Sequence, residues 1–161
     1  MNHEELKAKI KRWIREENFD ILQEVKHEKT NFILTIKSKE KSILNFPINV
    51  ISSKEPEGLV LGFTGRITGE DNKSFLGTDK KYREKMLEEL GGRTGLSKLS
   101  FIYSSNTNET RLRGTKAIYP KDITKDTFFM AISTLIDYRE YLHYVFKKYK
   151  FSRPKVDGYG I

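Results

Sequence analysis

The residues with the clearest chemical pattern in this sequence are clustered lysines and arginines. Arg111 and Arg113 stand two positions apart in "TRLRGTKAIY", where a strand would place both on one face and Lys116 on the other. The stretch "KKYKFSRPKVDGYGI" at residues 147–161 adds five basic residues interleaved with three aromatic ones. Cations contact phosphates while aromatic rings stack on bases, although a solvated strand face and a frayed tail would give the same pattern. The candidate anion- or nucleic-acid-binding residues are Arg111, Arg113, Lys116, Lys147, Lys148, Lys150, Arg153 and Lys155, with Tyr149, Phe151 and Tyr159 as stacking aromatics.

Residue types that serve catalysis or bind metals are scattered along the chain. The three histidines, His3, His27 and His143, have no metal-ligand spacing, and no serine or threonine stands in a nucleophile-elbow context. Carboxylate pairs occur in polar loops at residues 55–57 and 70–71, where nothing separates two pKa values as acid–base catalysis requires. We therefore predict no catalytic residue, no metal, no cofactor and no enzymatic activity.

A glycine-rich stretch at residues 62–80, "GFTGRITGEDNKSFLGTDK", invites comparison with a phosphate-binding loop. It lacks the glycine-lysine-hydroxyl ending that places an ammonium group and a magnesium ligand at the start of a helix. The preferred interpretation is a strand that leaves through a flexible loop, and nucleotide binding is the alternative.

Composition predicts one globular domain. The chain has 161 residues, 37% of them hydrophobic and none of them cysteine, which excludes disulfides and thiolate metal sites. No apolar run is long enough for a signal peptide or a membrane span, so we expect a cytoplasmic protein with no membrane partner. The formal net charge of +8 favours anionic partners, although 22 acidic residues among 30 basic ones also fit a solvated surface. We assign residues 1–150 to a single α+β domain and residues 151–161 to a basic tail.

Hydrophobic periodicity divides the first part of the chain into a helix and four strands. Apolar residues at helical spacing, preceded by an Asn2–Glu5 capping box, predict a helix over residues 4–17. Period-two alternation with short connections then predicts an antiparallel meander of four strands between residues 19 and 63, including alternation over 44–50. Pro47 predicts that its strand is at an edge or bulged.

In the second part of the chain, the hydrophobic period again changes between that of a helix and that of a strand. We predict a short middle helix that is capped by Thr78 and ends at the glycines after Leu90. A hairpin over residues 99–119 follows, and Thr124 caps a long last helix that extends to Tyr149. The predicted fold is therefore α+β, with the order α-ββββ-α-ββ-α and a twisted antiparallel sheet.

The last helix has two apolar faces. Its first half has one apolar stripe, and beyond Asp137 the stripe is displaced by about a quarter turn, more than supercoiling explains. Two different packing partners would account for this displacement. The sheet would lie beneath the first half, and a second subunit, helix one or a bound peptide would lie beside the second half. The alternative is a slightly bent helix whose two halves share a single core. The candidate protein-interaction residues are Tyr138, Tyr141, Leu142, Val145, Phe146 and Tyr149.

A resemblance to a known family rests on the order of elements and on three segments, which are "IKRWIREENF", "NFILTI" and "AIYPKDITKDTFFMAISTLIDY". The chain resembles a group of uncharacterised, mainly archaeal proteins related in fold to type III secretion chaperones and the YbjN-like proteins. The resemblance implies a frequently dimeric sandwich with helices on one side of a sheet, and in secretion chaperones the dimer holds an extended client. A single glutamine and the lack of cysteine suit a thermophile.

Two functions follow as expectations. The first is a non-enzymatic, chaperone-like protein-interaction module that self-associates and holds a protein client. The alternative is an accessory protein that binds nucleic acid or the ribosome through the basic strand and tail residues.

Overall fold

The protein is built on one antiparallel sheet of seven strands. The structure, a computed structural model, describes residues 2–40, 46–97 and 99–157. The strand order is β1-β2-β3-β4-β6-β5, and β7 pairs with β4 as well. The strands are β1 (Phe19–Val25), β2 (Thr30–Ser38), β3 (Ile48–Ser53), β4 (Gly58–Thr68), β5 (Ser100–Ser105), β6 (Glu109–Ile118) and β7 (Lys155–Asp157).

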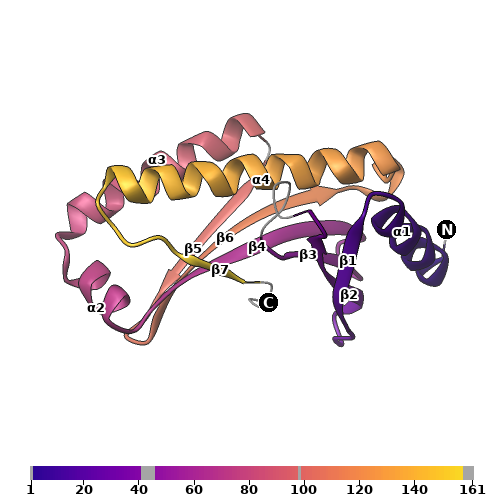
Figure 1. Ribbon diagram of the computed structural model, residues 1–161, viewed down its shortest axis with the longest axis horizontal. Helices are drawn as coiled ribbons and strands as arrows, with labels where there is room; N and C mark the ends of the chain where they lie inside the picture. The colour runs from indigo at the N-terminus through magenta and orange to yellow at the C-terminus, as the bar shows by residue number, and fades with distance from the viewer. Residues whose placement is uncertain (1, 41–45, 98, 158–161) are drawn as a thin grey trace.

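Four α-helices lie on one face of this sheet (Figure 1). α1 packs on β1 and β2, α4 on β4 and β6, and α3 lies beside the second half of α4. The opposite face carries no helix within the described residues, and we call it the helix-free face. The helices are α1 (His3–Glu16), α2 (Gly69–Gly77), α3 (Lys80–Ser97) and α4 (Lys125–Lys148), with a 3₁₀ turn η1 (Pro120–Asp122) before α4.

The mixed α+β class and the two terminal helices were predicted correctly. The Asn2 side chain accepts from the Glu5 amide at 2.8 Å while Glu5 accepts from the Asn2 amide at 3.1 Å, which confirms the capping box of α1. Thr124 caps α4 by accepting from the Thr127 amide at 3.1 Å. The predicted apolar stripe of α1 is buried against the sheet and α4, where Trp13 contacts Phe128.

The strand count and the glycine-rich loop were predicted wrongly. Six strands were expected and seven are present, and residues 64–68 continue β4 beyond the predicted strand end at Phe63 instead of leaving the sheet. A Cβ atom on Gly62 would lie 2.9 Å from the Gly114 carbonyl oxygen, so the glycine marks a close approach of two strands and not a flexible loop. Pro47 precedes β3, which is an internal strand, and Leu44 of the expected alternation lies outside the described residues.

The middle helix is in fact two helices. α2 occupies residues that were expected to form a loop, and Thr78 follows its end. α3 begins at Lys80, where Asp79 accepts from the Tyr82 amide at 3.1 Å and thus caps it in place of Thr78. α3 also continues through Gly91 to Ser97, so the predicted end at Leu90 is wrong.

Both halves of α4 are buried within the same chain. The first half belongs to a core cluster under α1 and the sheet, and the second half belongs to another cluster with α2 and α3. Five of the six residues predicted to contact a partner are buried, and Tyr141 is partly buried. The displaced stripe therefore reflects a second intramolecular surface, formed by α3 and by α2, which the sequence interpretation had missed. The five buried residues are Tyr138, Leu142, Val145, Phe146 and Tyr149.

The beginning of the predicted tail belongs to the folded body. After α4 the chain turns back across the molecule, and β7 pairs with residues 64–66 of β4 (Figure 1). Phe151 lies in the second core cluster with its ring 4.9 Å from that of Phe75, and Tyr149 is buried there too. These two aromatics hold the segment to the body and do not form an open stacking surface, while Tyr159 lies outside the described residues.

Candidate anion-binding site

The helix-free face carries cations on three neighbouring strands. Lys155 of β7 lies opposite Arg66 of β4, and Arg66 lies opposite Arg111 of β6. Arg113 follows Arg111 by two positions and thus shares its face, while Leu112 between them lies in the core. Neighbouring strands are about 4.8 Å apart and alternate residues about 6.8 Å apart, so four cations share a small area. We call Arg66, Arg111, Arg113 and Lys155 the basic cluster.

Glu109 offsets part of this charge, and Asp157 of β7 lies opposite Thr64 in the cross-strand row that also carries Arg113. Arg111 donates from Nε to Glu109 Oε1 at 2.6 Å, and Arg66 Nη1 lies 3.5 Å from Glu109 Oε2. Within the described residues, Arg113 has neither an ion pair nor a hydrogen bond from its side chain. Burial lowers the pKa of Arg113, and the charges of Arg111 and Arg66 lower it further. The cluster is therefore a place where positive charge is concentrated and incompletely neutralised.

The structure divides the predicted basic residues into groups. Arg111, Arg113 and Lys155 come together in the basic cluster, although they are far apart in sequence. Lys116 does not join them, because it lines a pocket beside α4 on the helix-covered side. Arg66 was missed in the sequence, since it stands in the glycine-rich stretch that was interpreted as a loop. The alternation of polar Arg66 with apolar Ile67, which is buried, could have indicated that this part of the stretch is a strand.

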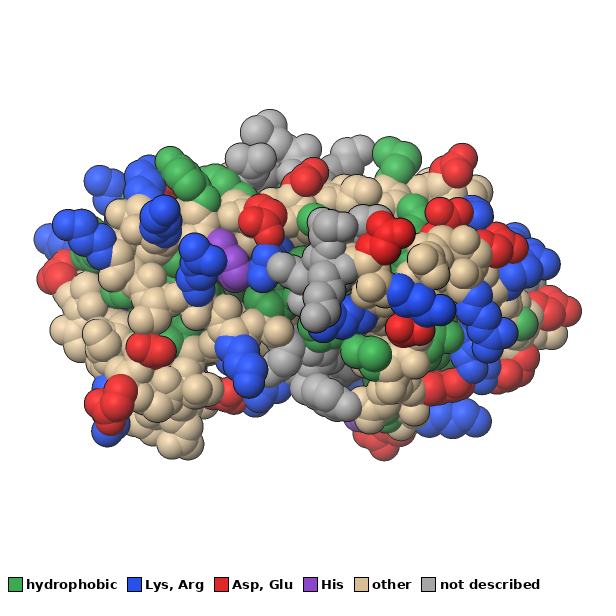
Figure 2. Space-filling view, in the orientation of Figure 1, with side chains coloured by type: hydrophobic (Ala, Val, Ile, Leu, Met, Phe, Trp, Pro, Cys, Tyr) green, Lys and Arg blue, Asp and Glu red, His purple; other side chains and the backbone are tan. Residues whose placement is uncertain are grey.

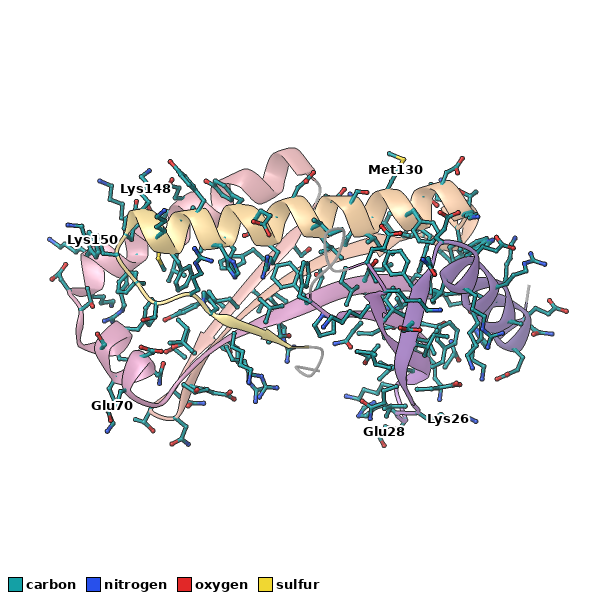
Figure 3. All side chains as sticks on the ribbon, in the orientation of Figure 1. Lys26, Glu28, Glu70, Met130, Lys148 and Lys150 are labelled. Atoms are coloured by element: carbon teal, nitrogen blue, oxygen red, sulfur yellow. The ribbon has the colours of Figure 1, made fainter. Side chains whose placement is uncertain are left out.

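The other predicted cations lie at the C-terminal end of α4. Lys148 and Lys150 are both found there, and Lys147 is exposed nearby (Figure 3). Lys148 donates to Glu89 of α3 at 2.8 Å, so its charge is already balanced. Arg153 is exposed in the segment that leads to β7. These residues do not extend the basic cluster, and over the whole view Lys and Arg are interspersed with Asp and Glu (Figure 2).

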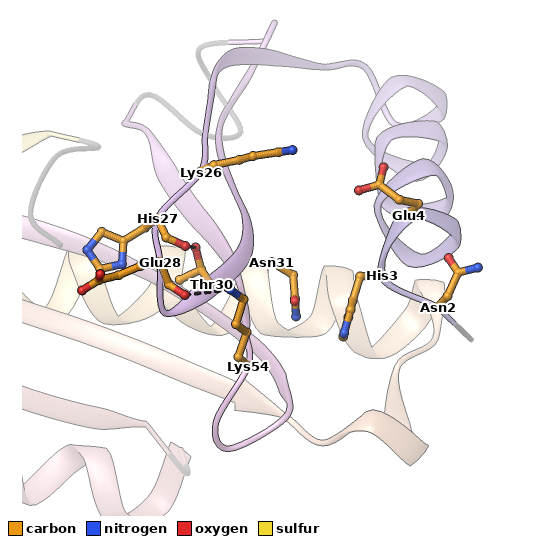
Figure 4. A pocket seen from close by; sticks show the side chains of 9 residues that line it. All are labelled: Asn2, His3, Glu4, Lys26, His27, Glu28, Thr30, Asn31 and Lys54. Atoms are coloured by element: carbon orange, nitrogen blue, oxygen red, sulfur yellow. Dashed lines mark hydrogen bonds between the residues drawn. The ribbon is translucent and has the colours of Figure 1, made fainter.

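A hollow outside the basic cluster lies between the start of α1 and the β1–β2 turn (Figure 4). It has a volume of about 660 Å³ and is lined by polar side chains. His27 and Glu28 point away from His3 and Glu4, so no acid–base pair converges there (Figure 4). Lys54 donates to the Glu28 carbonyl at 2.7 Å, which is a structural contact.

A second hollow of about 410 Å³ lies between β6, η1 and the first half of α4. Ala117, Ile118 and Ala131 contribute apolar surface to it, and Tyr119 and Met130 beside it are each 67% exposed. Met130 points away from the sheet (Figure 3). Exposed apolar side chains around a hollow are typical of an interaction surface.

Metal and membrane sites have no support in the described part of the chain. No group of three or more His, Cys, Asp or Glu side chains there could hold a metal ion. His143 is half-buried on α4, and burial and the nearby Arg139 lower its pKa. Among helices of the described residues, none combines the length and the apolar character needed to cross a bilayer.

Comparison with known proteins places this chain in an uncharacterised group. A family model described as "Uncharacterized conserved protein (DUF2299)" matches residues 6–146. The crystal structure of an uncharacterized protein from Methanothermobacter thermautotrophicus is similar, with a TM-score of 0.73 and 15% sequence identity over 91% of this chain and 99% of that one. This similarity shows the fold alone. No curated protein matches the sequence.

Proposed function

We propose that this chain, which belongs to the DUF2299 family of uncharacterised conserved proteins, is a non-enzymatic protein that binds the phosphate backbone of nucleic acid. The site is the basic cluster on the helix-free face. The single observation behind this proposal is Arg113, a partly buried guanidinium that lies near two further arginines and has no carboxylate partner among the side chains that the structure describes. A phosphate carries negative charge on acceptor oxygens whose geometry suits a guanidinium.

The arrangement of the cations favours a polymer with regularly spaced charges. Arg111 and Arg113 of β6 are two positions apart, which is a spacing of about 6.8 Å along the strand. Lys155, Arg66 and Arg111 lie on the neighbouring strands β7, β4 and β6, which are about 4.8 Å apart. Such a track can contact successive phosphates of one strand. Every aromatic side chain of the described strands lies in a core cluster, so no ring is available on this face to stack on bases. We therefore expect binding that depends little on base sequence.

The proposal is tested by fluorescence anisotropy with single-stranded and duplex oligonucleotides at low salt. The variant Arg113→Gln/Lys155→Gln removes two cations that have no ion pair among the described residues, so its fold should be preserved. We expect affinity to fall about tenfold or more, because two charge-assisted contacts are lost. Lys81→Gln/Lys121→Gln, which removes two exposed lysines elsewhere, is the matched control.

Competition with a polyglutamate peptide distinguishes binding of nucleic acid from binding of an acidic protein partner. If the cluster recognises phosphate backbones, the peptide should compete only weakly. Equal competition by polyglutamate, or equal loss of affinity in both double variants, would reject the proposed function.

Protein binding in the manner of secretion chaperones is a second candidate. The support for it is the hollow beside the first half of α4, where the side chains of Tyr119 and Met130 are exposed. The second half of α4, which was the predicted interaction surface, is buried within the chain and gives no support. We expect Met130→Glu to abolish protection of an unfolded client from aggregation, and any self-association seen by light scattering. Ser133→Glu, an exposed position on the same helix, is the control. Equal behaviour of the two variants would remove this candidate.

A further inference from the structure

The two edges of the sheet differ in their protection against pairing with another strand. β1 at one edge has a register shift between Ile21 and Gln23, and it carries Asp20 and Glu24, which form ion pairs with lysines. Bulges and charges of this kind keep an edge strand from pairing with another chain. β5 at the other edge, "SFIYSS", has no charged residue, proline or glycine, and its pairing with β6 shows no register shift. The edge at β5 is therefore unprotected.

The backbone of β5 turns hydrogen-bonding groups outward at every second residue. At the hairpin turn the Asn106 amide donates to the Glu109 carbonyl at 3.0 Å, so these two residues form a hydrogen-bonded pair. Such pairs alternate along an antiparallel ladder, so the even-numbered residues of β5 bond to β6 and the odd-numbered ones direct their N–H and C=O groups away from it. No strand of the described residues pairs with that side of β5. The outward-facing residues are Phe101, Tyr103 and Ser105.

The side chains of β5 divide between the two faces of the sheet. Ile102 lies opposite Arg113, which places it on the helix-free face, and it is 53% exposed. Phe101 and Tyr103 lie on the helix-covered side and are partly buried against the core clusters. A short strand with high β propensity and no charge readily pairs with another strand. The strand that fits this edge offers an apolar residue on one face and aromatic residues on the other.

We propose that this strand is β5 of a second copy of the chain, paired antiparallel about a two-fold axis at Ile102. The axis puts Ile102 opposite the partner's Ile102 in a non-hydrogen-bonded pair, where side chains approach most closely. Phe101 then lies opposite the partner's Tyr103, and these two residues bond through their outward-facing backbone groups. Ser100 lies opposite the partner's Ser104. Each side chain thus meets one of its own character, on the same face of a sheet that continues through both copies.

The charge of the chain favours a second copy at this edge. Two chains that each carry a net charge of +8 repel one another, so they associate most easily through an uncharged surface, which β5 provides. In the paired sheet the two Arg113 side chains are three strand spacings apart, about 14 Å. This distance exceeds the Debye length of about 8 Å at physiological salt, so their repulsion is largely screened.

Other occupants fit the edge less well. A nucleic acid strand would find no cation on β5, and an acidic peptide would be attracted to the basic cluster instead. The inference does not depend on the proposed function, because β5 contains no residue of the basic cluster.

Analytical ultracentrifugation tests the pairing. We expect wild-type protein to sediment with about twice the 18.8 kDa mass of one chain. Ile102→Lys places two ammonium groups against each other at the axis and should give a monomer, and Ile102→Glu should do the same with two carboxylates. A mixture of these two variants should sediment as a dimer again, because the charges at the axis are then opposite. Leu22→Lys, at a 56% exposed position on the β1 edge, is the matched control and should remain a dimer.

Hydrogen exchange shows whether a monomeric variant is still folded. In wild type we expect protected amides at Phe101, Tyr103 and Ser104. In Ile102→Lys the first two, which face outward, should lose their protection, while Ser104, which bonds to β6, should keep it.

Four results would overturn the inference. They are a monomeric wild-type protein, unprotected Phe101 and Tyr103 amides in wild type, no dimer in the mixture of variants, and dissociation of Leu22→Lys. A dimer that survives in Ile102→Lys and is lost in Met130→Glu would overturn it as well, since association would then run through the hollow beside α4.

Discussion

Arg66 of β4 lies directly opposite Arg111 of β6, so two like charges form a cross-strand pair on the helix-free face. Such pairs destabilise a sheet; Glu109 contacts both arginines and reduces their repulsion, and Arg113 adds a third cation nearby. We expect such an arrangement at a binding site, where stability is given up for affinity, and this agrees with the proposed function.

Removal of Arg113 should separate stability from binding. Because its charge is opposed by burial and by two neighbouring arginines, Arg113→Gln should leave the free energy of unfolding unchanged or raise it by up to about 1 kcal/mol. Nucleic acid binding should weaken in the same variant. Urea unfolding monitored by the fluorescence of Trp13, the single and buried tryptophan, measures the first effect. A loss of more than 1 kcal/mol would show that Arg113 is structural.

Glu109→Gln should act in the opposite direction. The change keeps the shape of the side chain but leaves Arg66 and Arg111 without their shared carboxylate. We expect the free energy of unfolding to fall by about 1 kcal/mol, while affinity for oligonucleotides rises several-fold as the cluster becomes more positive. Calorimetry and anisotropy on the same sample measure both quantities. Weaker binding would mean that Glu109 positions the arginines instead of competing with the phosphates.

Phe151 should be needed for the stability of the whole fold. Its ring packs at 4.9 Å from Phe75 and 6.2 Å from Phe146, and this contact holds the segment that carries Lys155. Phe151→Ala should lower the free energy of unfolding by about 2 kcal/mol, less than the roughly 3–5 kcal/mol lost when a fully buried Phe is truncated, because this ring is half-buried. Arg153→Ala, exposed in the same segment, should change it by less than about 0.5 kcal/mol. Equal effects would show that the segment does not contribute to the core.

The sequence predicted the elements that depend on local signals. Caps and apolar stripes define α1 and α4 through contacts within a few residues, so Asn2, Glu5 and Thr124 could be assigned without knowledge of the fold. The strands of the meander followed from period-two alternation in the same way.

The parts that were missed depend on long-range contacts. Gly65 resembles a loop residue until the segment with Pro154 is placed beside it, and β7 is only three residues long, too short to show alternation. The basic cluster joins β4, β6 and β7, so Arg66 could be grouped with Arg111 only after the strand order was known. The aromatic residues of α4 were assigned to a partner because α2 had not been recognised.

Tyr138 should make stability depend on alkaline pH. Its buried hydroxyl donates to the Leu90 carbonyl at 3.0 Å, and burial raises the pKa of Tyr138 well above the ordinary value of about 10. Above pH 10 the unfolded chain ionises at this residue while the folded chain does not, so the stabilisation present below pH 10 is lost as pH rises. Tyr138→Phe should cost about 1 kcal/mol at pH 7, and its deficit should shrink between pH 10 and 11. Parallel stability curves across this range would contradict the assignment.

The most direct measurement of the central claim is the salt dependence of oligonucleotide affinity. For a single strand, the slope of log K against log salt changes by about 0.7 for each phosphate contact. If the basic cluster contacts the backbone, Arg113→Gln/Lys155→Gln should reduce the magnitude of the slope by about 1.4, while Lys81→Gln/Lys121→Gln leaves it near the wild-type value. A slope that is unchanged in the first variant, or reduced equally in both, would contradict the assignment of the helix-free face as the binding site.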